Sequence, residues 1–197
     1  MKTGKNITRF LLLFYILVLF ALFLYSYTQV DLNLTISRIG FFQNIQKAFQ
    51  YIGFFQRPLS TVLYLTILAA LFVFYFFILR SISHGMMTRK YVWGLVLGGA
   101  VILTFSYPAF SYDIFNYMFT AKTILLYHKN PYEVIPLAFI AFDPWIYFMR
   151  WVHLPSAYTP IWILLTLPFY LFGFGLFLTT LFSFKLIAAI SYLITVW

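Results

Sequence analysis

The stretch that decides the fold begins SYDIFNYMFTAKTILLYHKNPYEVIP (residues 111–136) and ends DPWIYFMRWVHLPSAYTP (residues 143–160). It contains three of the chain's four acidic residues, Asp113, Glu133 and Asp143. The segments before and after it are dominated by apolar runs, several of them long enough to cross a bilayer as helices. We therefore expect any chemistry of this protein to lie between residues 111 and 160.

The composition is that of a membrane protein. Of the 197 residues, 63% are hydrophobic and only 9% are charged, whereas a soluble domain carries roughly 25% charged residues. The basic residues behind the net charge of +9 are scattered singly between apolar runs, where such residues set topology and meet anionic lipid headgroups. This pattern argues against a nucleic-acid partner. The chain has no cysteine, which excludes disulfides and thiol nucleophiles.

The apolar runs predict an all-α integral membrane protein with about five spans. Basic residues precede the first run, but the run is long enough to cross the membrane and lacks a small-residue cleavage pattern, so we interpret it as a retained anchor. Apolar residues at steps of three and four predict an amphipathic helix at about 36–55 that lies on the membrane interface. The predicted spans are 10–27, 59–79, 91–107, 161–178 and 181–197.

The five spans form one predicted polytopic domain, 1–197. An outer segment, 108–160, separates the third span from the fourth and holds interfacial helices. Gly173 and Gly175 are expected to loosen the fourth span or let it pack closely. Because the sequence stops at Trp197 inside an apolar run, we expect the chain to be the N-terminal part of a larger polytopic protein.

Basic residues in the short segments predict the orientation. Lys2, Lys5 and Arg9 precede the first span, and Arg80, Arg89 and Lys90 follow the second. By the positive-inside rule both groups are cytoplasmic. Residues 108–160 then face the extracytoplasmic side, in the plasma membrane if the source is prokaryotic.

A short amphipathic helix is predicted to follow the break at Pro108. Ser111 suits its N-cap, and Asp113 falls in its first turn, where the helix dipole favours an anion. Helical spacing then places Asp113, Asn116, Tyr117 and Thr120 on one face. This face presents a carboxylate, an amide and two hydroxyls. On spacing alone, however, a purely capping role for Asp113 is favoured over a catalytic one.

The other polar residues of the segment also have structural interpretations. Lys122, Lys129 and Arg150 suit interface anchors. The histidines at 84, 128 and 153 have no metal-site spacing, so no metal site is predicted. No phosphate-binding glycine loop and no G-x-S-x-G motif are present in the sequence.

Three short motifs follow one another in the segment: SYDIFNY (111–117), NPY (130–132) and PSAYTP (155–160). This order resembles the first large outer loop of the GT-C glycosyltransferases, specifically the polyprenol-phosphate-dependent mannosyltransferase-like branch. The resemblance covers about 50 residues and the flanking spans. Two features depart from the family pattern. The loop follows the third span here instead of the first, and the family fold has more spans than the five predicted.

The resemblance implies an inverting hexosyltransferase, with mannose as the expected sugar. Its donor would be a polyprenyl-phosphate sugar and its acceptor a hydroxyl of a glycan or glycolipid on the extracytoplasmic side. Asp113 matches the family's catalytic acidic residue, and the resemblance implies that its carboxylate acts as general base on the acceptor hydroxyl. The leaving phosphate would need positive charge, for which Lys122, Arg150 and His153 are the candidates. The other predicted substrate-binding residues are Asn116, Tyr117, Asn130, Tyr132 and Tyr158. No cofactor is predicted apart from the lipid-linked donor substrate, and dependence on a divalent metal is left open.

Two other classes of protein remain compatible with the sequence. A non-enzymatic scaffold or transporter subunit would also have membrane spans and interfacial helices. Transport predicts ionisable groups inside the spans, and the predicted spans contain almost none before Lys185. A lipid-linked oligosaccharide polymerase or ligase would place its chemistry in an outer loop rich in arginine, whereas this segment has only Arg150.

Overall fold

The computed structural model describes residues 2–197 and contains helices, turns and loops but no strand within that range. Three of its helical segments are long and apolar enough to cross a membrane: Thr8–Gln29, Arg57–Ser83 and Phe177–Val196. The prediction of an all-helical membrane protein is therefore confirmed at this level. Two compact units can be distinguished. The first comprises residues 1–30, 37–107 and 192–197, and the second comprises residues 31–36 and 108–191.

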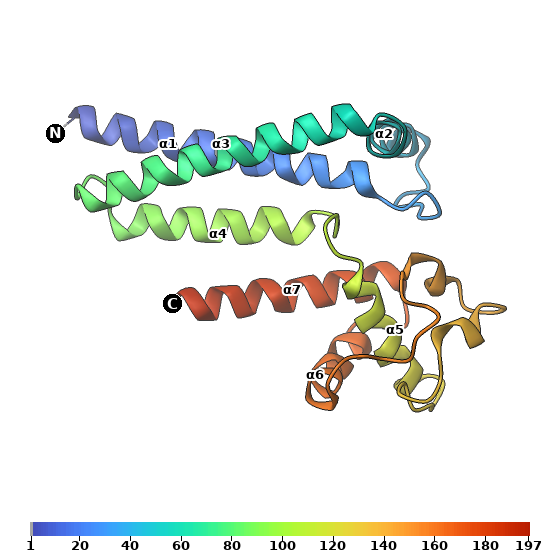
Figure 1. Cartoon of the computed structure of the whole chain (residues 1–197). Helices are drawn as coiled ribbons and strands as arrows, with labels where there is room; N and C mark the ends of the chain where they lie inside the picture. The colour runs from blue at the N-terminus through green and yellow to red at the C-terminus, as the bar shows by residue number, and fades with distance from the viewer. Residues whose placement is uncertain (1) are drawn as a thin grey trace. The chain divides into compact units, whose positions relative to one another are not determined.

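The longest helices of the first unit are α1 (Lys2–Ser26), α3 (Arg57–Ser83) and α4 (Arg89–Phe105). Figure 1 shows α1 and α3 side by side, with α4 next to them. Long apolar runs without internal proline favour these helices, and Pro58 occupies the first turn of α3, where its missing N–H costs nothing.

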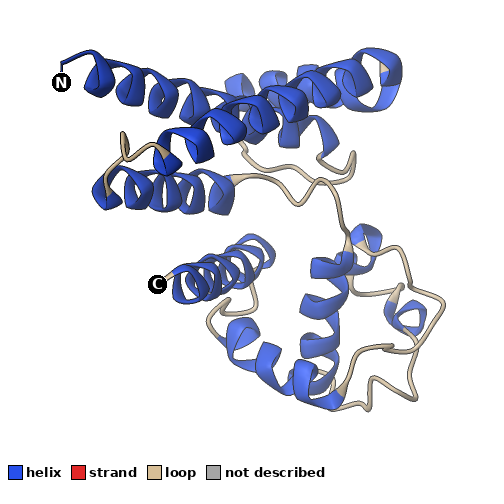
Figure 2. Cartoon of the chain, turned by 60° about the vertical axis from the view of Figure 1, so that its left-hand side comes forward, coloured by secondary structure: helices blue, strands red, loops and turns tan. Residues whose placement is uncertain are grey.

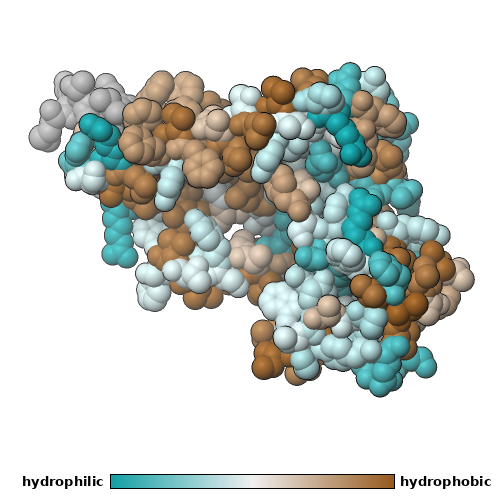
Figure 3. Space-filling model, viewed as in Figure 1, coloured by the Kyte–Doolittle hydropathy of each residue, from teal (hydrophilic) through white to brown (hydrophobic). Residues whose placement is uncertain are grey.

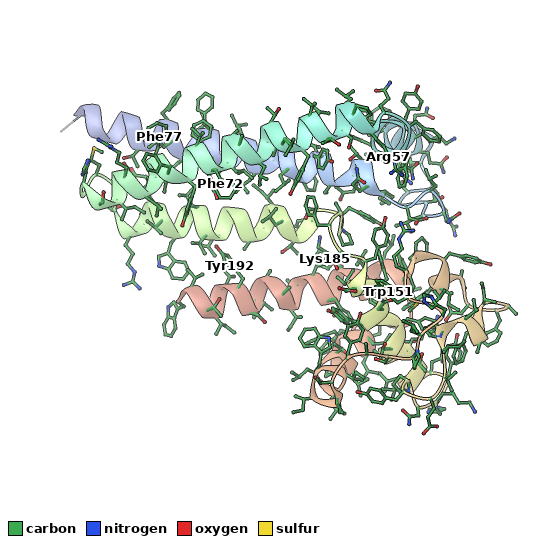
Figure 4. All side chains as sticks on the ribbon, in the orientation of Figure 1. Arg57, Phe72, Phe77, Trp151, Lys185 and Tyr192 are labelled. Atoms are coloured by element: carbon green, nitrogen blue, oxygen red, sulfur yellow. The ribbon has the colours of Figure 1, made fainter. Side chains whose placement is uncertain are left out.

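The outer surface of this unit is apolar. On α3, Phe72 is 64% exposed and Phe77 is also exposed. Figure 4 labels both residues. Brown, apolar side chains cover much of the visible surface of α1 and α3 in Figure 3. A helix that is hydrophobic on all sides yet not buried in protein suits a lipid environment.

Glycines let α4 approach α1 closely. A Cβ placed on Gly98 would lie 2.9 Å from Cδ1 of Ile16, and one on Gly99 would lie 3.6 Å from Cδ1 of Leu19. Small residues allow membrane helices to pack at short range in this way. At 17 residues, α4 is about 26 Å long.

The predicted amphipathic helix at 36–55 is found as α2 (Gly40–Gln50) followed by a π-helical turn, Tyr51–Phe55. The large apolar side chains Phe41, Phe42 and Ile45 are exposed. Buried Gln50 donates from Nε2 to the carbonyl oxygen of Val30 at 3.3 Å, which ties α2 to the end of the first span. Contact of α2 with a membrane interface stays a prediction.

The second unit is built on α5 (Asp113–Leu125), α6 (Pro160–Leu171) and most of α7 (Phe177–Val196). Figure 2 shows the long loops, in tan, that connect α5 to α6. Two 3₁₀ turns interrupt these loops, Pro136–Phe139 and Pro144–Phe148. The core of the unit is aromatic: the Phe115 ring lies 6.0 Å from that of Phe148 and 5.8 Å from that of Phe177.

The predicted fourth span, 161–178, is wrong as a single helix. Helix α6 ends at Leu171, after only 12 residues, or about 18 Å. The chain then turns through Phe174 and Gly175, which have φ values of 51° and 72°, before α7 begins at Phe177. A Cβ on Gly173 would overlap Thr180 of α7, so Gly173 is the position of close packing. Glycine tolerates both the positive φ and the close approach.

Candidate active site

Helix α5 begins with Asp113, whose side chain is partly exposed. The prediction that Ser111 caps this helix needs correction, because Tyr112 occupies the N-cap position. The Ser111 hydroxyl instead closes a local turn with Asp113. Its Oγ accepts from the Asp113 N–H at 3.2 Å and donates to Asp113 Oδ2 at 3.1 Å. Serine often bonds locally to the residue two places later in this way. The serine therefore holds the carboxylate at the start of the helix.

A second hydroxyl reaches the same carboxylate from the distant PSAYTP motif. Tyr158 donates from its hydroxyl to Asp113 Oδ1 at 3.3 Å, and Asn116 Nδ2 donates to the Tyr158 hydroxyl oxygen at 3.3 Å. Asn116 lies one helical turn after Asp113, as the spacing predicts. The three side chains therefore form a chain of hydrogen bonds, which sequence spacing alone could not show.

Two further bonds attach the NPY motif to the PSAYTP motif. The Tyr132 hydroxyl donates to the carbonyl oxygen of Tyr158 at 2.6 Å, and the N–H of Ser156 donates to the carbonyl oxygen of Pro131 at 2.8 Å. Asn130 shapes the turn within the NPY motif, because its Oδ1 accepts from the Tyr132 N–H at 3.1 Å. Asparagine followed by proline is well suited to such a turn. Asn130 and Tyr132 thus support the loop that presents Tyr158.

Tyr117 packs beside this chain of hydrogen bonds. Its ring centroid lies 4.6 Å from that of Tyr158 and 5.2 Å from that of Trp162, both edge to face. Burial, with a further contribution from the Asp113 charge, raises the pKa of Tyr117. Burial, opposed in part by the Asn116 hydrogen bond and reinforced by Asp113, raises the pKa of Tyr158 to about 12. Tyr158 therefore keeps its proton and remains a donor to Asp113 at physiological pH.

Of the three predicted phosphate-binding cations, Arg150 contacts the residue that directly precedes Asp113. Its guanidinium carbon is 4.4 Å from the ring centroid of Tyr112, the residue before Asp113. The Tyr112 ring holds the guanidinium, and because Arg150 is exposed, the guanidinium N–H groups remain able to bind an anion. The exposed His153 packs instead near Trp151, with ring centroids 6.4 Å apart.

Lys122 has a different role from the one predicted. Its Nζ lies 2.7 Å from Oδ2 of Asp143, and their side chains are 9% and 0% exposed. The same ammonium lies 4.0 Å from the Trp145 ring centroid. A lysine held in a buried ion pair is not available to bind a leaving phosphate. No local sequence pattern indicates this pairing, because a long stretch of chain separates the two residues.

Asn116 shows one unusual feature. It is 4% exposed, and its Oδ1 has no hydrogen-bond partner among the described residues. Leaving a buried acceptor unpaired costs about 1–3 kcal/mol. Such a cost is tolerated most readily where the residue has a functional role.

No group of three or more potential metal ligands is found in the part of the chain that the structure describes.

The apolar helices and their exposed surfaces define the class: a helical membrane protein with a polar site at the start of α5. Comparison with protein-family models, curated proteins and solved structures finds no match for this chain. The function must therefore be argued from the site itself.

Proposed function

We propose that this protein is a membrane glycosyltransferase that moves a hexose, with mannose as the expected sugar, from a polyprenyl-phosphate donor to an acceptor hydroxyl. One observation carries the proposal. The three motifs SYDIFNY, NPY and PSAYTP, which suggest this class by their order, are joined by hydrogen bonds around the accessible carboxylate of Asp113. Residues far apart in the sequence thus contribute to one site.

In the proposed reaction Asp113 is the general base. It removes the proton from the acceptor hydroxyl while the acceptor oxygen bonds to the anomeric carbon of the donor sugar. The bond from that carbon to the phosphate oxygen breaks on the opposite face, so the configuration inverts. The polyprenyl phosphate leaves with the electron pair, and Arg150 stabilises its negative charge.

The proposed topology places this chemistry at the outer membrane surface. The N-terminus is cytoplasmic, because basic residues lie at the N-terminal end of α1 and flank the connection between α3 and α4. Helix α4 crosses the membrane with α1, α3 and α7, and residues 108–160 are extracytoplasmic. The lipid-linked donor then approaches from the bilayer and the glycan or glycolipid acceptor from the aqueous side.

The test is sugar transfer in membranes that contain the complete open reading frame encoding this chain. Radiolabelled polyprenyl-phosphate mannose is supplied first, followed by other polyprenyl-phosphate hexoses. Asp113→Asn should lower the rate about 10²- to 10⁴-fold at unchanged protein level, because it removes the base. Asp31→Asn, a matched change of another aspartate, should leave the rate unaltered. Equal transfer by wild type and Asp113→Asn, or no transfer by wild type from any donor, would contradict the proposal.

A further inference from the structure

The hydrogen bonds around Tyr158 show how its hydroxyl is used. A phenol has one proton to donate, and Tyr158 directs it to Asp113 Oδ1. The hydroxyl oxygen must then accept the bond from Asn116, so the Asn116 amide must present Nδ2. The orientation of the amide is thereby fixed, and Oδ1 points to a buried position without a partner among the described residues.

From this we infer that Tyr158 and Asn116 are positioning residues that hold the Asp113 carboxylate and do not contact the sugar. The inference deepens the proposed function and rests on it for its kinetic consequence. It changes the sequence-based prediction, which placed both residues among those that bind substrate.

The surroundings of Tyr158 support a fixed position. Its carbonyl oxygen is held by the Tyr132 hydroxyl at 2.6 Å, and its ring packs against Tyr117. With Ser111 bound to Oδ2 and Tyr158 bound to Oδ1, both carboxylate oxygens have one donor. Each oxygen keeps a further lone pair, and one of these can accept the proton of the acceptor hydroxyl.

Neither Arg150 nor Lys122 takes over this task. Arg150 stacks on Tyr112. Lys122, which lies near the end of α5, is paired with Asp143 of the following loop. Helix α6 contributes Trp162, an uncharged side chain, to the packing around Tyr117. Two hydroxyls, not a cation, therefore orient the proposed base.

The first readout does not depend on activity. The 197-residue chain contains three aspartates, at positions 31, 113 and 143, so labelling the aspartate carboxyl carbon with ¹³C gives three NMR signals. Asp113→Asn identifies the Asp113 signal in lipid nanodiscs. Tyr158→Phe should displace that signal, because one of its two side-chain hydrogen bonds is lost. Tyr147→Phe removes a hydroxyl from an exposed tyrosine of the same segment and should not displace it.

A second variant guards against loss of folding in Tyr158→Phe. Asn116→Leu replaces the buried amide by an apolar group of similar size and leaves the Tyr158 hydroxyl in place. The Asp113 signal should move in the same direction as in Tyr158→Phe, but by less. An Asp113 signal that is unmoved in both variants would overturn the inference.

The second readout separates positioning from substrate contact. A misaligned base slows the chemical step, so Tyr158→Phe should lower kcat about 10- to 100-fold with little change in KM. A raised KM at unchanged kcat would make Tyr158 a substrate contact and overturn the inference while leaving the proposed function intact. If wild type transfers no sugar, the proposed function fails, and the NMR result still decides whether Tyr158 holds Asp113.

Discussion

Two aspartates of the second unit have opposite surroundings: Asp113, which begins α5, and Asp143, which lies in the loop after that helix. Asp143 is 1% exposed and has three donors: Lys122 Nζ at 2.7 Å, the Tyr127 hydroxyl at 2.7 Å and the Trp145 N–H at 3.0 Å. Asp113 is partly exposed, and its side chain accepts from the hydroxyls of Ser111 and Tyr158 at 3.1 and 3.3 Å. The first carboxylate is buried and held by three donors, whereas the second is accessible, has two donors to its side chain, and keeps room for another partner.

The difference separates a carboxylate that is enclosed in the protein from one that remains accessible. A buried charge is stable only when it is fully paired and hydrogen-bonded, and Asp143 meets this condition. Its bond to the backbone of Trp145 also starts the 3₁₀ turn Pro144–Phe148. A general base must instead be within reach of the proton that it removes. Of these two carboxylates, only Asp113 is accessible enough for that task.

The largest effect should come from breaking the buried pair. Lys122→Met leaves the Asp143 charge buried without its cation, and Asp143→Asn does the same to Lys122. Each single substitution should lower the free energy of unfolding by about 3–5 kcal/mol. Equilibrium unfolding in mixed detergent micelles, followed by circular dichroism, measures this loss.

Two further variants sharpen that result. Lys122→Met combined with Asp143→Leu removes both charges, and should recover most of the lost stability because neither charge remains buried alone. Asp113→Asn should change the free energy of unfolding by less than about 1 kcal/mol, since its carboxylate is partly solvated. A loss in Asp113→Asn as large as that in Asp143→Asn would remove the distinction between the two sites.

A smaller effect is expected from removing the exposed cation Arg150. Arg150→Gln should raise the KM for the polyprenyl-phosphate donor about 10-fold, because a charge-assisted contact to phosphate is lost. The free energy of unfolding should stay unchanged, as Arg150 is exposed. Steady-state transfer kinetics at varied donor concentration measure the KM. Lys129→Gln, which removes another exposed cation of the same unit, is the control, and an equal rise in that variant would reduce the effect to general surface charge.

Much of this fold was predictable because it depends on local sequence. Uninterrupted apolar runs predict α1, α3 and α7, and the position of Asp113 after Pro108 predicts the start of α5. The fourth span was mispredicted because hydropathy does not register the turn at Phe174 and Gly175. The apolar run continues through this turn, although the helix does not.

The contacts of the site were less predictable, because they join distant residues. Helical spacing correctly places Asn116 on the face of Asp113, one turn away. Neither the bond from Tyr158 to Asp113 nor the pairing of Lys122 with Asp143 leaves a local pattern, since each bridges a loop. A lone lysine on a short amphipathic helix suits an interface anchor equally well. Only the folded loop shows that Lys122 is enclosed and Arg150 is not.

The smallest effect compares the tyrosines that donate to the two carboxylates. Burial and the nearby charge of Asp113 raise the pKa of Tyr158 to about 12, and burial with the Asp143 hydrogen bond also raises that of Tyr127. A raised pKa means that the folded state binds the phenol proton more tightly. The contribution of the protonated phenol to the free energy of unfolding is therefore complete below about pH 10, the usual tyrosine pKa. It is lost as the pH rises towards the pKa of the folded state.

For Tyr158 this contribution should be at most about 1 kcal/mol, because solvent screens a half-exposed group. The difference in unfolding free energy between wild type and Tyr158→Phe should accordingly narrow between about pH 10 and about pH 12, and that between wild type and Tyr127→Phe should persist to higher pH. Differences that stay constant over this range for both tyrosines would show that neither phenol is held by its carboxylate.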